Sequence, residues 1–364
     1  MERIFQILIS SLLILPSIGM AQDTEAYHER LEFDPATGKW KELPPPIPGT
    51  EGGDLALARS MLAKGEYKNA RKAFKKWFEQ YPESPYWPEA LFYAAETEVS
   101  AEDVKPRSGD VMQAYEWLET LLEGWRGHEL ADRALHKEFI IAEMLLFKER
   151  KQKIWGGVLW LSAKEEALDI LNKIIDLWAP GTPLAERALR FKADYHYQNG
   201  EFEEAEMAYA RLMRDFPRGQ YHRFAMLRSG QSALARFPGI QFDEADLLEA
   251  EVYLRDFHDR YPEESAEKSV PQLLKGITDR RAEKEYSIGQ YYERTDAIDA
   301  AAYYYRWIIE NYPETTWSAQ SQDRLIALGG LEEEAQDELD LDLEDLEETD
   351  VMAEPTAMMP ADEN

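Results

Sequence analysis

The sequence predicts an all-α fold built from repeated helix pairs, and three observations lead to this prediction. From Leu55 to Leu328 apolar residues recur at helical spacing, and few stretches alternate with the period of two that strands require. The prolines of this region fall between helical segments, where a missing N–H and a fixed φ are tolerated. One arrangement of small and large apolar residues returns six times. We therefore expect about five to six helix pairs in residues 55–328.

Each repeat contains an alanine followed by large apolar residues four, seven and eleven positions later, which is one face of an α-helix. The last of these residues is aromatic in all six repeats, although aromatic residues are only 12% of the chain. Four of the aromatics directly precede a proline, so we expect the second helix of each pair to end there. The six sets are Ala70-Phe74-Trp77-Tyr81, Ala114-Leu118-Leu121-Trp125, Ala167-Leu171-Ile174-Trp178, Ala205-Tyr209-Leu212-Phe216, Ala250-Leu254-Phe257-Tyr261 and Ala301-Tyr305-Ile308-Tyr312.

This pattern resembles the tetratricopeptide repeat, a helix–turn–helix unit of 34 residues, and the resemblance implies an α-solenoid. The last unit shows it best, with Gly289 and Tyr292 in its first helix and Ala301, Tyr305 and Pro313 in or after its second. Successive repeat alanines are 44, 53, 38, 45 and 51 residues apart. Additional residues are therefore expected between the units.

Residues 1–21 have the pattern of a cleaved secretory signal. Arg3 precedes an apolar stretch from Ile4 to Leu15 that is too short to span a bilayer, and the small residues Gly19 and Ala21 occupy the positions that signal peptidase reads. The alternative interpretation is an uncleaved anchor. Cleavage predicts an exported, periplasmic protein, either free or peripheral at the outer membrane.

The segments that flank the repeats have different compositions. Residues 22–54 lack a helical period and contain the proline-rich run Leu43–Pro48, so we expect an extended arm, with a small hairpin between Phe33 and Trp40. Residues 329–364 follow the last repeat, and residues 331–364 hold 15 acids and no Lys or Arg. Such a run repels itself and buries little, which predicts a disordered acidic tail.

Charge and cysteine content exclude several classes of function. The 71 Asp and Glu against 41 Lys and Arg give a net charge of −30, which disfavours nucleic acid and anionic lipid as partners. Without cysteine the chain has no disulfide, no thiol chemistry and no lipidated N-terminal cysteine, so no direct lipid anchor is expected. The six histidines are scattered without metal-ligand spacing, and no nucleophile elbow or phosphate-binding glycine loop is present. We expect no enzyme activity, no cofactor and no metal site.

The long spacers between the repeats and the aromatic-proline sequence that ends the second helices narrow the resemblance to one family of repeat proteins. Gly65-Glu-Tyr67 through Tyr81-Pro82-Glu83-Ser84, and Arg281 to Tyr286 through Tyr312-Pro313-Glu314-Thr315, are similar to the BamD family, which assists the assembly of outer-membrane β-barrels. The resemblance implies a non-catalytic scaffold whose partners are unfolded outer-membrane proteins and the barrel-assembly subunit. It also implies that the N-terminal units hold client segments while the last units dock the assembly machine.

The concave face of such a solenoid, built from the first helices, is its expected binding surface. Tyrosine and arginine are good anchors there because they combine contact area with polar ends. Projecting the repeat consensus onto this face gives these candidates: Arg59, Arg187, Arg190, Asp194, Tyr197, Glu283, Tyr286, Gln290 and Arg294. An ordinary solvated face is the alternative for each of them.

Two further interpretations stay open. The apolar run Ile154–Leu161 contains Trp155 and Trp160 and either caps the core or forms an exposed docking loop. The alternative function is that of a periplasmic repeat adaptor that coordinates cell-wall synthesis with envelope constriction, like the Tol–Pal-associated repeat protein.

Overall fold

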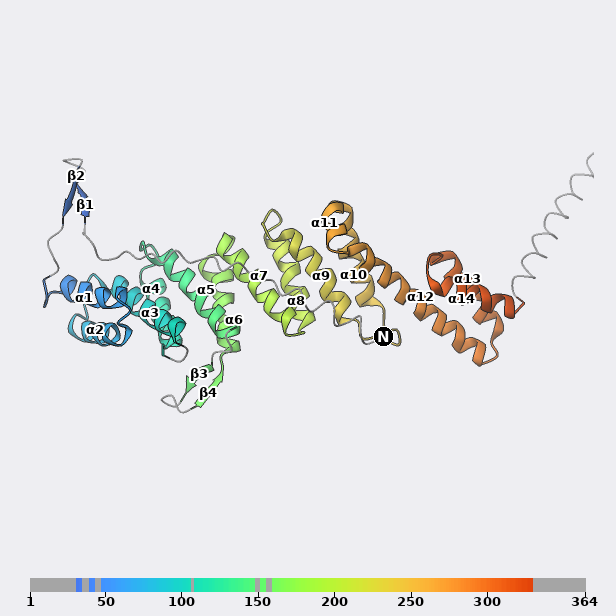
Figure 1. The fold of residues 1–364 in the computed structure, drawn as a ribbon, viewed down its shortest axis with the longest axis horizontal. Helices are drawn as coiled ribbons and strands as arrows, with labels where there is room; N and C mark the ends of the chain where they lie inside the picture. The colour runs from blue at the N-terminus through green and yellow to red at the C-terminus, as the bar shows by residue number, and fades with distance from the viewer. Residues whose placement is uncertain are drawn as a thin grey trace, which may run out of the picture. The chain divides into compact units, whose positions relative to one another are not determined.

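The computed structural model describes residues 31–34, 39–42, 47–105, 108–147, 151–154 and 159–329. The signal peptide expected at residues 1–21 and nearly all of the acidic tail, from residue 330 onward, lie outside this part. The chain divides into two compact units, Met1–Pro180 and Gly181–Asn364 (Figure 1). Each unit is described by itself.

In the part of the first unit that the structure describes there are three helix pairs and two small hairpins. The first helix begins at Glu51, four residues before the boundary expected at Leu55, because the Thr50 hydroxyl caps it by accepting a hydrogen bond from the Gly53 N–H at 3.1 Å. The helices are α1 (Glu51–Ala63), α2 (Tyr67–Gln80), α3 (Trp87–Val104), α4 (Val111–Gly124), α5 (Ala131–Phe147) and α6 (Lys164–Lys173), which continues into the π-helical turn η2 (Ile174–Trp178).

Both hairpins are antiparallel and two-stranded. Strands β1 (Leu31–Asp34) and β2 (Lys39–Glu42) pair Phe33 with Trp40, as the sequence predicts for that segment. Strands β3 (Lys151–Ile154) and β4 (Leu159–Ser162) lie between α5 and α6 and pair Lys153 with Trp160. The second hairpin was not anticipated, and it accounts for most of the additional residues between the second and third repeat alanines.

Within its described residues, the second unit contains three further helix pairs, one short helix and a final helix. Its helices are α7 (Pro183–Gln198), α8 (Phe202–Asp215), α9 (His222–Arg236), α10 (Ala245–Arg260), the short α11 (Pro262–Glu267), α12 (Val270–Arg294), α13 (Ile298–Asn311) and α14 (Thr316–Ala327). Pairing joins α7 with α8, α9 with α10, and α12 with α13, while α14 covers the last pair. The all-α prediction and the expected number of pairs are confirmed within the described residues.

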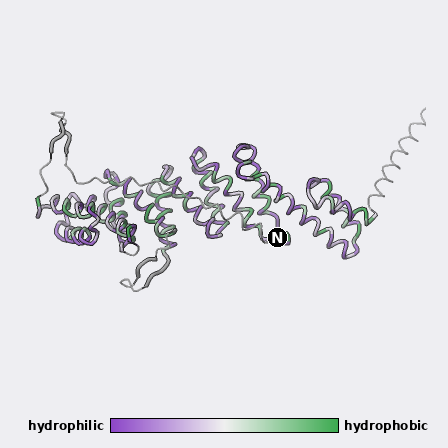
Figure 2. The backbone as a smooth tube through the Cα atoms, in the orientation of Figure 1, coloured by the Kyte–Doolittle hydropathy of each residue, from purple (hydrophilic) through white to green (hydrophobic). Residues whose placement is uncertain are grey.

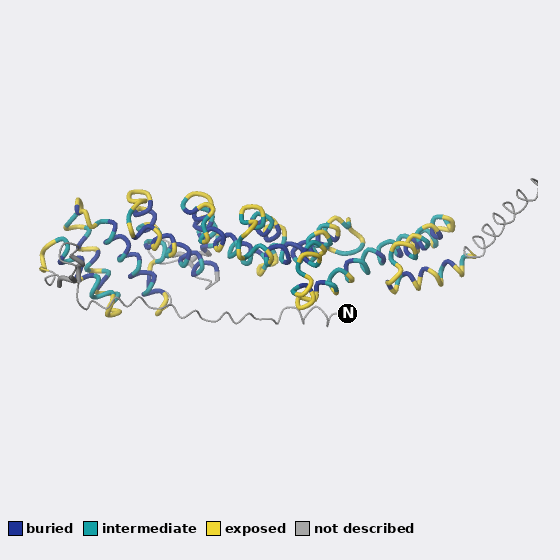
Figure 3. Tube along the Cα trace, turned by 90° about the horizontal axis from the view of Figure 1, so that it is seen from above, coloured by how far each residue is buried: buried dark blue, intermediate teal, exposed yellow. Residues whose placement is uncertain are grey.

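The repeat face forms the core of both units. In all six repeats the alanine and the residues four and seven positions later are at most 1% exposed, and Trp77, Tyr209 and Tyr305 are the largest of these side chains. Figure 2 shows hydrophilic and hydrophobic residues alternating along the helices, and Figure 3 shows that buried stretches are followed by exposed turns. Alanine at the centre of the face allows the paired helices to pack closely.

The aromatic residue eleven positions after the repeat alanine ends the second helix of each pair, as predicted. In five repeats it is the C-terminal capping residue, with φ between −140° and −128°, and its N–H donates to the carbonyl four residues earlier. The third repeat differs because the N–H of Ala179 donates to the Ile174 carbonyl, five residues earlier, at 3.0 Å. This π-helical turn contains one extra residue, which explains why Pro180 follows Trp178 at a distance of two.

None of the helices within the described ranges is long and apolar enough to cross a membrane.

Candidate protein-binding surface

In the first unit, arginines on the first helix of one pair contact aromatic rings on the first helix of an adjacent pair. Arg59 on α1 donates a hydrogen bond from Nη2 to the Tyr93 hydroxyl on α3 at 2.8 Å, and its guanidinium carbon lies 4.0 Å from the centre of that ring. On α5, the guanidinium carbon of Arg133 lies 4.8 Å from the centre of the Phe92 ring. Arginine stacking on aromatic faces therefore links α1, α3 and α5.

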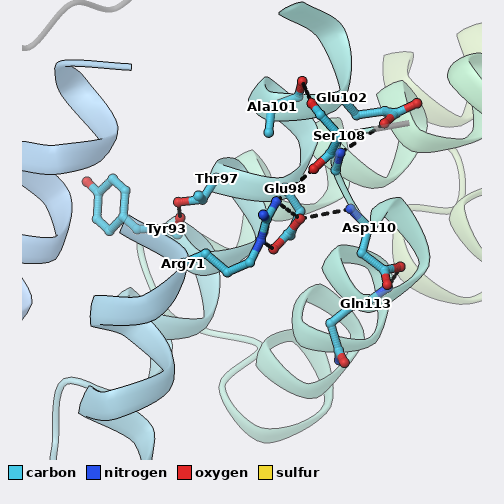
Figure 4. A network of polar contacts seen from close by, with 10 residues as sticks. Arg71, Tyr93, Thr97, Glu98, Ala101, Glu102, Ser108, Asp110 and Gln113 are labelled. Atoms are coloured by element: carbon cyan, nitrogen blue, oxygen red, sulfur yellow. Dashed lines mark hydrogen bonds and ion pairs between the residues drawn. The ribbon is translucent and has the colours of Figure 1, made fainter. Parts of the chain in front are cut away.

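A polar network connects α2 and α3 to residues 108–110, which precede α4 (Figure 4). The buried Glu98 carboxylate of α3 accepts from Nη2 of Arg71 on α2 at 2.6 Å and from the Asp110 N–H at 2.8 Å. Arg71 also donates to the Ser108 carbonyl at 3.0 Å, and the hydrogen bond to Glu98 raises the arginine pKa. The ion pair between Arg71 and Glu98 therefore connects the first helix pair to the second, and its further hydrogen bonds reach Ser108 and Asp110 before α4.

The second unit repeats the arginine–aromatic theme between α7 and α9. The guanidinium carbon of Arg190 on α7 lies 4.5 Å from the centre of the Tyr221 ring and 4.6 Å from that of Phe224. Arg228 on α9 points the other way, with its guanidinium carbon 4.5 Å from the Tyr197 ring on α7 and 5.3 Å from Phe224. Two cations and three rings are thus interleaved.

Asp194 supplies the negative charge beside these arginines. Its carboxylate lies 3.3 Å from Nε of Arg190 and accepts a hydrogen bond at 2.6 Å from the hydroxyl of the buried Tyr209 on α8. Burial raises the Asp194 pKa, while the Tyr209 hydrogen bond and the charges of Arg190 and Arg228 oppose that rise. The carboxylate therefore pairs with Arg190 and lies in the field of Arg228.

These residues define what we call the α7–α9 surface, and all of them are partly exposed. They are Arg190, Asp194, Tyr197, Tyr221, Phe224 and Arg228. Guanidinium groups held on aromatic rings bind carboxylates and aromatic side chains with little loss of side-chain freedom. Three of the six, Arg190, Asp194 and Tyr197, were predicted from the sequence.

The candidates in the last repeat divide between surface and core. Glu283 is partly exposed, and Gln290 and Arg294 are exposed on α12. Tyr286 is only 7% exposed, and its ring packs against those of Tyr305 at 5.5 Å and Trp317 at 5.2 Å. The prediction that Tyr286 lies on the concave binding face was therefore wrong. Tyr286 is a core residue, because α14 covers that face of α12.

The remaining candidates are less informative. Arg187 is exposed on α7, one turn before Arg190. Trp160 lies in strand β4, and Trp155 lies outside the described residues.

The sequence did not identify Tyr93, Tyr221, Phe224 or Arg228. The candidates were found by counting back from the repeat alanine of a second helix to the first helix of the same pair. This count is reliable only where the connection between the two helices is short, such as residues 199–201 between α7 and α8. The connection between α9 and α10, residues 237–244, is longer, so counting back from Ala250 loses the register of α9. The useful signal was the spacing of four between Phe224 and Arg228, which places them on one face of a helix.

Comparison with known families gives two matches. Residues 162–336 match the family described as outer membrane lipoprotein, and residues 54–84 match the tetratricopeptide repeat. The first range includes the whole α7–α9 surface. No curated protein matches the sequence.

The comparison with solved structures finds chains of low sequence identity, several of them described as tetratricopeptide-repeat proteins. The C-terminal part of a tetratricopeptide-repeat protein from Cytophaga hutchinsonii is 12% identical, covering 75% of this chain and 88% of that one with a TM-score of 0.37. A tetratricopeptide-repeat protein from Parabacteroides merdae is 12% identical, with coverages of 76% and 98% and a TM-score of 0.33. The type IV pilus biogenesis factor PilW is 14% identical, with coverages of 74% and 97% and a TM-score of 0.26.

Proposed function

We propose that this chain, which is similar to the outer membrane lipoprotein family over residues 162–336 and to the tetratricopeptide repeat over residues 54–84, is a BamD-like, non-catalytic periplasmic scaffold for the assembly of outer-membrane β-barrel proteins. The observation that carries the proposal is the α7–α9 surface, which lies inside the residues that match the outer membrane lipoprotein family. On this proposal the surface holds segments of unfolded outer-membrane proteins, and Glu283, Gln290 and Arg294 contribute to docking the barrel-assembly subunit.

The chemistry of the surface suits such clients. Strand segments of β-barrel proteins carry apolar and aromatic residues at alternate positions. The C-terminal segment also ends in the free carboxylate of the chain. Phe224, Tyr221 and Tyr197 offer ring edges to aromatic side chains, and Arg190 and Arg228 offer planar donors to a carboxylate. A surface of this kind binds extended peptide without any catalytic group.

Substitution of the two arginines tests the proposal. Arg190→Lys together with Arg228→Lys keeps both charges but removes the planar stacking on the rings. Arg214→Lys is the matched control, because Arg214 lies on α8, away from this surface, with a side chain that is 72% exposed. Tagged protein is recovered from the intact envelope after mild crosslinking, and the captured outer-membrane proteins and barrel-assembly subunit are measured.

We expect the double variant to lose most of the client capture and the control to retain it. Capture of neither clients nor the barrel-assembly subunit by the unaltered protein would refute the assembly role. Equal capture by the double variant would refute the assignment of the α7–α9 surface.

A further inference from the structure

The last repeat carries a second surface that shares no residue with the α7–α9 surface. Four tyrosine rings follow one another across the end of α12 and the middle of α13. Tyr292 and Tyr304 are stacked, with ring centres 5.6 Å apart and planes 13° apart. Tyr291 contacts Tyr292 at 5.6 Å, and Tyr303 contacts Tyr304 at 5.5 Å, both edge to face. We call this series, together with Trp307, the tyrosine surface.

The outer members of the tyrosine surface face solvent. Tyr303 is 59% exposed, Tyr291 is 56% exposed and Trp307 is 41% exposed. Tyr303 and Trp307 are one turn apart on α13, on the side away from the buried Ala301 and Tyr305. Exposed aromatic rings gathered on one face are typical of a binding surface, because each ring offers a large rigid contact and a polar tip.

The charges around these rings are mostly negative. Residues 285–311 contain five acidic residues and two arginines, and one of the acids, Glu293, is paired with Arg324 of α14. Asp299 and Glu310 are exposed on α13, one turn before Tyr303 and almost one turn after Trp307. Burial raises the pKa of Tyr304, and the neighbouring Glu285 raises it further. The negative faces of the rings and the carboxylates both favour a cation.

We propose that the tyrosine surface docks a basic segment of a partner protein in which Lys or Arg side chains alternate with apolar residues. The apolar residues would pack on Tyr303 and Trp307, and the cations would lie over the rings and near Asp299 and Glu310. The acidic C-terminal residues of this chain, with 15 acids and no Lys or Arg, have the wrong charge for the site. A surface of anionic lipid is disfavoured for the same reason.

A set of synthetic peptides provides the probe. The first is a fluorescein-labelled peptide of alternating arginine and leucine with serine spacers, and its two partners replace every arginine with citrulline or with glutamate. Binding to the full chain is measured by fluorescence anisotropy. We expect the arginine peptide to bind at least about tenfold more tightly than the citrulline peptide. The glutamate peptide should show no binding that depends on Tyr303 and Trp307.

Variants of exposed residues test whether the arginine peptide binds at α13. Tyr303→Ser with Trp307→Ser should weaken binding of the arginine peptide about tenfold or more. Met207→Ser with Val252→Ser is the matched control, because both residues are exposed and, like Tyr303, lie two positions after a repeat alanine. The control should bind as the unaltered protein does. Asp299→Asn with Glu310→Gln separates the charge contribution from the ring contribution and should weaken binding severalfold.

Three outcomes overturn the proposal. Equal binding of the arginine and citrulline peptides would show that charge does not select the partner. Unchanged binding by the Tyr303 and Trp307 double variant would place the site elsewhere. Self-association of the unaltered protein in analytical ultracentrifugation that this double variant abolishes would identify a second copy as the occupant. The proposal is independent of the client role, because Arg190→Lys with Arg228→Lys should leave peptide binding unchanged.

Discussion

At the scale of single residues, Glu138 on α5 is the most informative side chain of the first unit. It is completely buried, and burial together with the negative charge of Glu119 raises its pKa well above the ordinary value. The folded unit therefore keeps the proton at pH values where the unfolded chain releases it. The contribution of Glu138 to the free energy of unfolding is fully present below its ordinary pKa of about 4.5 and is lost as the pH rises toward the folded pKa, by about 1.4 kcal/mol for each pH unit between the unfolded and folded pKa values.

Glu138→Gln tests this linkage, because glutamine has the same shape and does not titrate. We expect the variant to unfold like the unaltered protein near pH 5 and to be more stable at pH 8. Unfolding in denaturant is followed by tryptophan fluorescence, which reports mainly on the first unit, since eight of the ten tryptophans lie in residues 1–180. Glu123→Gln, at an exposed position on α4, is the control. A stability difference that does not grow with pH would contradict the prediction.

Tyr209 provides a second prediction at this scale. Its hydroxyl is buried and donates to Asp194, the carboxylate that pairs with Arg190 on the α7–α9 surface. Tyr209→Phe should lower the free energy of unfolding by about 1–3 kcal/mol, because a largely buried carboxylate loses its donor. Circular dichroism during thermal unfolding measures the change, and Tyr303→Phe, with an exposed ring, should have no effect. A loss no larger than that of Tyr303→Phe would show that water replaces the hydroxyl.

At the scale of elements, the close approach of α12 and α13 depends on one glycine. A Cβ atom at Gly289 would lie 2.9 Å from Cε1 of Tyr305, which is completely buried. Gly289→Ala should therefore destabilise the pair by about 1–3 kcal/mol. Gly276 lies in the same helix, where the nearest atom is 3.9 Å away, so Gly276→Ala should be neutral or stabilising by up to about 1 kcal/mol. Thermal unfolding of both variants checks the two predictions. Equal changes in the free energy of unfolding would mean that the Tyr305 ring moves aside.

The second helices were the predictable elements. Their alanine, the two large residues and the terminal aromatic follow from helical geometry and proline chemistry, so Ala70 and Ala301 mark buried faces without further information. The hairpin β3–β4 was not predictable, because Ile154–Leu161 has no clear alternation with polar residues. The extra residue before Ala179 was visible as a shifted proline, but only the hydrogen bond to Ile174 identifies it as a π-helical turn.

The candidate surface was predictable in part for the same reason. Arg190, Asp194 and Tyr197 precede a second helix by a short turn, so counting back from Ala205 identifies three residues on one side of α7, and their role in binding stays a prediction. Tyr286 satisfies the same count and is nevertheless buried, because a helix that follows the last repeat covers it. Sequence spacing identifies the face of a helix, whereas the identity of what covers that face depends on tertiary packing.

At the scale of the whole molecule, charge is the property that a partner meets first. Half of the net charge of −30 lies in residues 331–364, so a chain that ends at Gly329 carries about half the attraction for a basic partner. We expect this truncation to slow association of the arginine peptide severalfold at low salt and to leave its dissociation rate unchanged, because the tyrosine surface stays intact. In about 0.5 M NaCl, where the screening length is only a few ångströms, the two chains should associate at equal rates. Stopped-flow anisotropy measures both rates, and a faster dissociation from the truncated chain would contradict the prediction by showing that the acidic residues contact the bound peptide.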